Sequence, residues 1–134
     1  MSRIERSKLT ARILIEIGAI NFSIISPFKL SSGFLSPSYI DCRKIIAYPS
    51  AFKTITDMMI DTIKSNMAPQ TPSYIIGGET AGIPFATAIA QKMGLPLSYV
   101  RKQPKDHGKN KLIEGEILKG KNSLLVEDLM TDGK

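Results

Sequence analysis

Residues 123–134 read SLLVEDLMTDGK, and this stretch decides the fold. Residues 124–126 form a short, continuous apolar run, which is typical of a strand buried on both faces of a parallel sheet. Two adjacent carboxylates, Glu127 and Asp128, follow at the point where such a strand gives way to a loop. The sequence therefore predicts a buried parallel strand with acidic side chains at its carboxyl end.

The last four residues, Thr131–Lys134, have the composition of a phosphate-binding turn. Glycine permits backbone conformations that aim successive N–H groups inward, the hydroxyl and amides donate, and a following helix N-terminus favours the anion. A parallel strand also needs a crossover helix after it to cover one face and return the chain. Because the sequence stops at Lys134, we expect it to be the N-terminal portion of a longer protein.

The composition is that of one globular domain. Of the 134 residues, 43% are apolar and 22% are charged, which is ordinary for a soluble protein. The single cysteine, Cys42, has no partner for an intramolecular disulfide, and this suits a reducing compartment. The charged N-terminus lacks a signal peptide, and no apolar run approaches the length of about 20 residues that a membrane span needs. We expect a cytoplasmic protein with no membrane partner.

The net charge of +6 suits either a nucleic acid or a polyphosphate ligand. Most of the excess lies in one part of the chain, with no interleaved aromatic residues to stack on bases. This distribution favours a small polyphosphate over a nucleic acid. The basic residues concerned are Arg101, Lys102, Lys105, Lys109, Lys111, Lys119 and Lys121.

The first part of the chain predicts a small cap over residues 1–48. Apolar residues at helical spacing predict an amphipathic helix over 2–20 that ends near Gly18. Short β-branched runs broken by prolines then predict two or three short strands over 21–47, of which 28–30 and 39–42 are placed to pair antiparallel. Pro37 is expected at an edge or at a strand start, where its missing N–H does no harm.

The second part, from about residue 49, predicts the core of the same single domain. Pro49 is expected to open a helix, since proline is tolerated in the first turn. Strands and helices that alternate at this spacing predict a parallel α/β sheet. The expected segments are a strand at 74–76, a glycine-rich loop at 77–82, a helix at 83–93, a strand at 97–101, a charged loop at 102–114 and a short element at 113–118.

Two groups of side chains are candidates for chemistry. Glu127 and Asp128 either cap the next helix in solvent or accept hydrogen bonds from sugar hydroxyls, directly or through Mg²⁺. The cationic group at 101–107 is either a solvated loop or a site for an anion such as a diphosphate leaving group. With His107 as the only histidine, a multi-histidine metal site is excluded.

These residues resemble a known family. LLVEDLMTDGK, at 124–134, is similar to the 5-phosphoribosyl-1-diphosphate (PRPP) motif of the type I phosphoribosyltransferases. SYVRKQPKDHGKNKLIEG, at 98–115, resembles the R-K-x-x-K-x-H-G loop of the orotate phosphoribosyltransferases. Residues 26–44 and 77–90 resemble the cap and the diphosphate-side loop of the same family, so the resemblance covers nearly the whole chain.

The resemblance implies an α/β fold of the type I phosphoribosyltransferases, in which helices flank a parallel sheet and a small N-terminal cap contains β-strands. The later strands and helices of that fold would lie beyond Lys134. The implied reaction joins orotate to PRPP with Mg²⁺ and gives orotidine 5′-monophosphate and diphosphate, in pyrimidine (UMP) biosynthesis. The implied assembly is a homodimer with shared active sites, and its partners are the small molecules PRPP and orotate.

The resemblance also implies residue roles. Arg101, Lys105 and His107 would be catalytic, in a loop that closes over the diphosphate. Glu127 and Asp128 would bind ribose hydroxyls, and Thr131–Lys134 would hold the 5-phosphate. The implied PRPP contacts are Arg101, Lys102, Lys105, His107, Glu127, Asp128, Leu129, Met130, Thr131, Asp132, Gly133 and Lys134.

Further roles follow from the same resemblance. Thr131 would also approach orotate, Glu79–Gly82 would lie beside the diphosphate, and Tyr39 and Ile40 would lie where the cap contacts the base. No side chain is implied as a direct metal ligand, because Mg²⁺ would be bound together with PRPP. Ser31 and Phe34 stand where the family commonly has basic residues, so neither is given a substrate contact.

Three alternatives stay open at this point. The chain resembles other type I phosphoribosyltransferases in its PRPP motif, so a different base is possible. A nucleic-acid-binding regulator on the same fold and an inactive structural fragment are the others. We expect residues 1–134 alone to bind PRPP poorly and to have no useful activity.

Overall fold

The computed structural model describes residues 1–30, 32–104 and 112–130. It divides into two compact units, Met1–Lys53 and Thr54–Lys134, and each is described by itself. The division falls within helix α2 (Pro49–Asn66). No helix in the described ranges has both the length and the apolar character that crossing a membrane requires.

Helix α1 (Arg3–Glu16) opens the first unit and begins with a capping box. The Ser2 hydroxyl accepts from the Glu5 N–H at 3.2 Å, and the Glu5 carboxylate accepts from the Ser2 N–H at 2.6 Å. The helix stops just before Gly18, whose φ of 65° is the left-handed conformation that favours glycine. The predicted helix and its end near Gly18 are confirmed.

The strands of the first unit pair differently from the prediction. β1 (Ile20–Phe22) pairs antiparallel with β4 (Ser38–Ile40), and β2 (Phe28–Lys29) pairs with β3 (Leu35–Ser36). The predicted pairing of 28–30 with 39–42 is therefore wrong. A tight turn returns the chain at once, with the Leu30 N–H donating to the Phe34 carbonyl at 2.8 Å, so β2 meets the strand that follows it directly.

Pro37 lies between β3 and β4, next to the start of β4, and its carbonyl accepts from the Ser23 N–H at 2.8 Å. The position confirms the expectation for this proline. A short 3₁₀ helix, η1 (Cys42–Ala47), follows β4, and α2 begins at Pro49 as predicted.

The second unit is built on a four-stranded sheet in the order β7-β6-β5-β8. β5 (Tyr74–Gly78) lies between β6 (Leu97–Val100) and β8 (Ser123–Val126), and all three are parallel. β7 (Ile113–Glu114) adds antiparallel to β6 and is the strand of the predicted element at 113–118. The predicted α/β class is confirmed, with an antiparallel edge strand that the sequence did not indicate.

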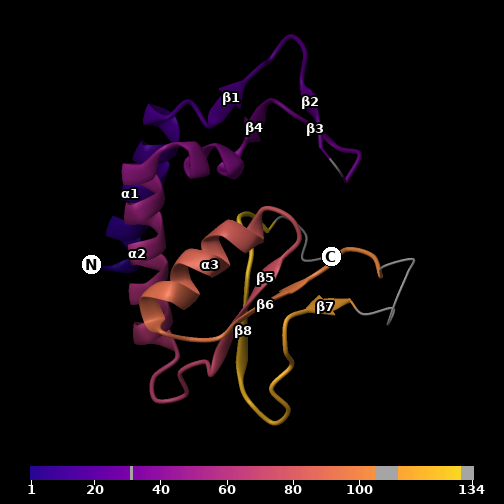
Figure 1. Ribbon diagram of the computed structural model, residues 1–134. Coiled ribbons are helices and arrows are strands. Elements are labelled where there is room, and N and C mark those ends of the chain that lie inside the picture. Colours follow the sequence, from indigo (N-terminus) through magenta and orange to yellow (C-terminus); the bar gives the residue numbers. More distant parts are fainter. Residues whose placement is uncertain (31, 105–111, 131–134) are drawn as a thin grey trace. The chain divides into compact units, whose positions relative to one another are not determined.

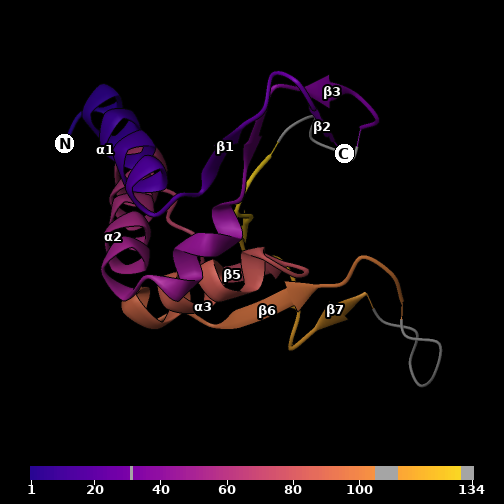
Figure 2. The ribbon, with the colours of Figure 1, turned by 90° about the horizontal axis from the view of Figure 1, so that it is seen from above.

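Helix α3 (Gly82–Met93) connects β5 to β6 and packs on one face of this sheet (Figure 1 and Figure 2). It ends at Gly94, which has a φ of 64°, as the sequence predicted. Ile75 of β5 and Phe85 and Ile89 of α3 are fully buried and form the centre of the core. This packing holds β5, β6 and β8 so that their carboxyl ends share one edge.

β8 is not buried on both faces, contrary to the prediction. Val126 is 4% exposed, whereas Leu125 is 56% exposed. Successive residues of a strand point to opposite faces. Helix α3 contacts β8, so the buried Val126 lies on the covered face and Leu125 points to the opposite face. The continuous apolar run identified a strand correctly, but it overstated how much of that strand is covered here.

Candidate functional site

Three loops meet at the carboxyl edge of the parallel strands. Glu79 follows β5, Arg101 and Lys102 follow β6, and Glu127 and Asp128 follow β8. In open α/β sheets this edge is where ligands bind. The parallel register therefore brings together candidate residues that lie far apart in the sequence, and it places both acidic and basic groups in one region.

The Glu127 carboxylate lies in a seat made by two glycines. A Cβ atom on Gly78 would overlap the carboxylate, and one on Gly82 would lie 3.0 Å from its Oε2 atom and would overlap the Val126 carbonyl oxygen. Neither glycine has a positive φ, so each is required by close approach rather than by an unusual backbone conformation. The glycine-rich loop thus positions an acidic side chain of the neighbouring strand.

The pKa of Glu127 is raised above its ordinary value. The residue is exposed overall, but partial burial of its carboxylate against Gly78 and Gly82 is the largest cause, and the negative charge of Asp128 adds to it. The positive charge of Lys102 and a hydrogen bond from the Asp128 N–H act in the opposite direction. Lys102 and Glu127, both predicted to contact PRPP, are thus close enough to interact electrostatically.

Glu79 joins the glycine-rich loop to the start of the basic segment. Its carboxylate accepts a hydrogen bond from the Lys102 N–H at 2.8 Å, and its own N–H donates to the Val100 carbonyl at 2.9 Å. The Glu79–Thr80 peptide bond is cis. The family resemblance implied that Glu79 lies beside the diphosphate. It did not predict the bond to Lys102, because only the parallel pairing of β5 with β6 brings the two residues together.

Arg101 lies on the β7 side of the same loop. Its backbone N–H donates to the Leu112 carbonyl at 2.7 Å, and its guanidinium lies 3.8 Å from the Glu114 carboxylate. The guanidinium also donates to the Gln103 carbonyl at 3.3 Å. Arg101 and Lys102 are adjacent in sequence, but their side chains have different partners. The sequence predicted one cationic cluster. In the structure the Arg101 guanidinium lies beside Glu114, whereas the charge of Lys102 acts on Glu127.

Several predicted site residues lie outside the described part of the chain: Lys105, His107, Thr131, Asp132, Gly133 and Lys134. Leu129 and Met130 are described, and both are exposed. Among the residues the structure does describe, no group of three or more His, Cys, Asp or Glu side chains is arranged to hold a metal ion.

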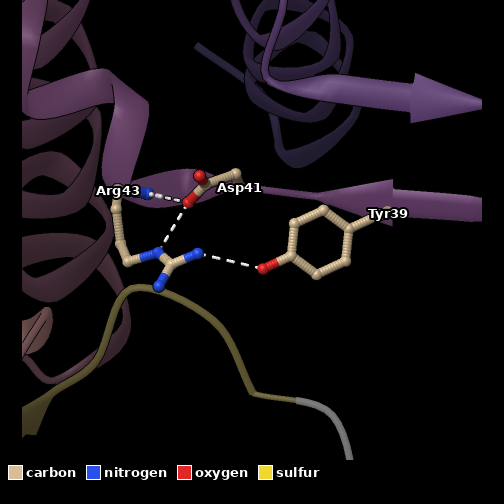
Figure 3. Close-up of polar contacts among 3 residues, drawn as sticks. All are labelled: Tyr39, Asp41 and Arg43. Atoms are coloured by element: carbon tan, nitrogen blue, oxygen red, sulfur yellow. Dashed lines mark hydrogen bonds and ion pairs between the residues drawn. The ribbon is translucent and has the colours of Figure 1, made fainter. Parts of the chain in front are cut away.

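The first unit carries its own polar cluster around Tyr39 (Figure 3). The Arg43 guanidinium donates to the Asp41 carboxylate at 2.6 Å and to the Tyr39 hydroxyl at 2.9 Å. The ring of Phe28 lies 5.6 Å from that of Tyr39, measured between centroids. Tyr39 was predicted to contact the base, whereas Asp41 and Arg43 were not singled out. Asp41 is the N-cap of η1 and Arg43 lies within it, and no pattern in the sequence indicated their contacts with Tyr39.

Comparison with known proteins agrees with this architecture. The profile of the phosphoribosyl transferase domain matches residues 43–134. The orotate phosphoribosyltransferase of Ruegeria sp. is 51% identical over 129 residues, which are 96% of this chain and 57% of that protein. The chain therefore spans a little over half the length of this curated relative.

Solved structures show the same fold. The UMP synthase of Leishmania donovani superposes with a TM-score of 0.70 at 29% identity, over 89% of this chain and 24% of that one. The orotate phosphoribosyltransferase of Aeropyrum pernix superposes with a TM-score of 0.61 at 31% identity, over 78% of this chain and 55% of that one. With the match over residues 43–134, the chain belongs to the phosphoribosyl transferase domain family and has the type I phosphoribosyltransferase fold.

Proposed function

We propose that the protein containing this chain is an orotate phosphoribosyltransferase, which forms orotidine 5′-monophosphate and diphosphate from orotate and PRPP in pyrimidine biosynthesis. The observation that carries the proposal is the meeting of Glu127, Asp128 and Lys102 at the glycine-lined carboxyl edge of the sheet. The relative from Ruegeria, which bears this name, supports the choice of substrate.

The reaction requires the ribose to lose diphosphate while its C1 acquires oxocarbenium character. In the proposal, Glu127 and Asp128 accept hydrogen bonds from the ribose hydroxyls and so hold the ring. Lys102 and Arg101 supply positive charge on the side of the leaving group, where charge accumulates as the bond breaks. In the proposal, Lys105 and His107 complete this cationic set, and Thr131–Lys134 bind the 5-phosphate.

Mg²⁺ belongs to the proposal as an ion bound together with PRPP. Two carboxylates with hydroxyl and phosphate oxygens from the substrate fit the preference of Mg²⁺ for oxygen ligands shared between protein and phosphate. When bound, the ion neutralises negative charge on the diphosphate. Glu127 and Asp128 are the side chains that would face it, through the ribose hydroxyls rather than as a complete protein cage.

The proposal includes a homodimer in which subunits share active sites and a cytoplasmic location. Cys42 is buried, and as the single cysteine of this sequence it forms no intramolecular disulfide, which suits a reducing compartment. The oligomeric state is measured by light scattering on the protein extended through its native downstream sequence.

The test of the proposed function is the release of diphosphate from PRPP and orotate with Mg²⁺. It compares residues 1–134 with the extended protein. We expect activity from the extended protein, its loss on chelation of Mg²⁺, and no useful turnover by residues 1–134. Activity of the extended protein with adenine or another base, and none with orotate, would overturn the substrate while leaving the family unchanged. Turnover of orotate by residues 1–134 would refute the expectation that this portion is inactive.

A further inference from the structure

Glu79 lies at the carboxyl edge of the sheet and is hydrogen-bonded to the backbone of the neighbouring loop. Its Oε2 atom accepts from the Lys102 N–H at 2.8 Å, and its N–H donates to the Val100 carbonyl at 2.9 Å. These two bonds lie on either side of Arg101. They tie Glu79, the first residue after β5, to Val100 at the end of β6 and to Lys102 two residues beyond it.

The bond matters because Lys102 is where the basic segment leaves the sheet. Within β5 and β6 the parallel ladder aligns the backbones, up to the pair Gly78 and Val100. Beyond that pair the strand pairing stops. There the Glu79 carboxylate accepts a hydrogen bond from the Lys102 N–H. This bond fixes the backbone of Lys102 where the strand pairing has ended.

The position of Lys102 has an electrostatic consequence. Its charge acts on Glu127, whose carboxylate sits against Gly78, the residue before Glu79. Glu79 therefore holds by its side chain the backbone of the residue whose charge acts on Glu127, while the preceding glycine makes room for the Glu127 carboxylate. An acidic residue beside a polyphosphate would by charge alone weaken binding, so its role must come from the bond that it makes.

We propose that Glu79 is a positioning residue that fixes Lys102 for the diphosphate of PRPP, acting through the reach of its hydrogen bond and not through its charge. This inference rests on the proposed function. Glu79 itself needs no contact with substrate. The alternative is that Glu79 only stabilises the loop after β6 and has no effect on substrate binding.

Two conservative variants of the extended protein separate the two roles. Glu79→Gln keeps the length and an acceptor oxygen but loses the charge, whereas Glu79→Asp keeps the charge but is one methylene too short to hold the bond at 2.8 Å. We expect Glu79→Gln to keep the KM for PRPP within about threefold of wild type, and Glu79→Asp to raise it about tenfold with a smaller change in kcat, which is the worth of one ordinary hydrogen bond.

A double-mutant cycle with Lys102→Ala supplies the second readout. Once the ammonium is gone, its backbone position has little effect on PRPP, so Glu79→Asp should add less than twofold to the KM of Lys102→Ala. Glu116→Gln is the matched control, because Glu116 is an exposed acidic residue on the segment after β7. Its KM should equal that of wild type.

Three results would overturn the inference: Glu79→Asp with a normal KM, Glu79→Gln as impaired as Glu79→Asp, or effects of Glu79→Asp and Lys102→Ala that multiply. Thermal unfolding of each variant shows whether the fold is intact, and a purely structural role would lower the Tm without the KM pattern.

If the extended wild type ignores orotate but uses another base, the proposed function fails and the KM for PRPP is measured with that base. If it uses none, calorimetric binding of PRPP with Mg²⁺ replaces the KM.

Discussion

Gly78 and Glu127 lie so close together that the carboxylate of Glu127 occupies the space a side chain on Gly78 would need. Strand β5 ends with Gly78 and strand β8 ends just before Glu127, so this contact joins the glycine-rich loop to the acidic pair. It explains why a chain with a carboxylate at the end of β8 has glycine at the end of β5. The contact also makes Gly78 a sensitive place to disturb the site.

Gly78→Ala should displace Glu127 and impair the site. Overpacking of this kind costs about 1–3 kcal/mol of stability, and the displaced carboxylate should raise the KM for PRPP in the extended protein. Urea unfolding and steady-state kinetics measure the two effects. The control is Gly94→Ala, where a Cβ meets nothing within 4 Å but the φ of 64° is unfavourable. It should lose similar stability and keep its KM. An unchanged KM for Gly78→Ala would contradict the prediction.

Glu127→Gln should stabilise residues 1–134 at neutral pH. Because the pKa of Glu127 is raised in the folded protein above its ordinary value of 4.5, the folded state binds this proton more tightly than the unfolded chain. Its contribution to stability is fully present below pH 4.5 and is lost as the pH rises through the raised pKa. Glutamine never ionises, so the variant avoids that loss.

The measurement is the urea midpoint of both proteins from pH 4 to pH 8, with Glu116→Gln as the control for removing one negative charge. The gain of Glu127→Gln should shrink as the pH falls through the folded pKa. A gain that does not depend on pH, or lower stability at pH 7, would show that the attraction of Lys102 outweighs burial and the charge of Asp128.

The ion pair between Arg101 and Glu114 should be weak but measurable. The two groups lie 3.8 Å apart, and each side chain is 27% exposed, so their coupling should be about 0.5–1 kcal/mol. A double-mutant cycle of Arg101→Ala and Glu114→Ala, followed by urea unfolding, isolates this pair from the other contacts of both residues. The coupling should fall in 1 M NaCl, where screening is strong. Additive single effects would show that the pair contributes nothing.

Tyr39→Ala should act on orotate rather than on PRPP. If the Tyr39 ring contacts the base, as the resemblance implies, its removal should raise the KM for orotate about tenfold in the extended protein. The KM for PRPP should change less. Tyr48→Ala is the control, since Tyr48 is a 43% exposed tyrosine a few residues beyond the Tyr39, Asp41 and Arg43 cluster. Equal rises for both substrates would remove Tyr39 from base recognition.

The sequence predicted the parts of the molecule that depend on local chemistry. Short apolar runs located β5 and β8. Pro49 marked the start of α2, and Gly18 and Gly94 marked the ends of α1 and α3, because proline and glycine restrict or permit particular backbone angles. The prediction for the cap strands was wrong. Strands of two or three residues have too few side chains to specify a partner, so turn geometry decided the pairing instead.

The sequence by itself determined that acidic and basic groups follow the strands of an α/β sheet, because strand ends and residue types can be read from local pattern. Only the tertiary structure decided which groups meet. Parallel pairing brought the Glu79 carboxylate to the Lys102 N–H and the Glu127 carboxylate against Gly78. The antiparallel pairing of β7 brought Glu114 beside the Arg101 guanidinium. These contacts depend on strand order and register, which arise from packing between segments far apart in the chain, and no local pattern encodes them.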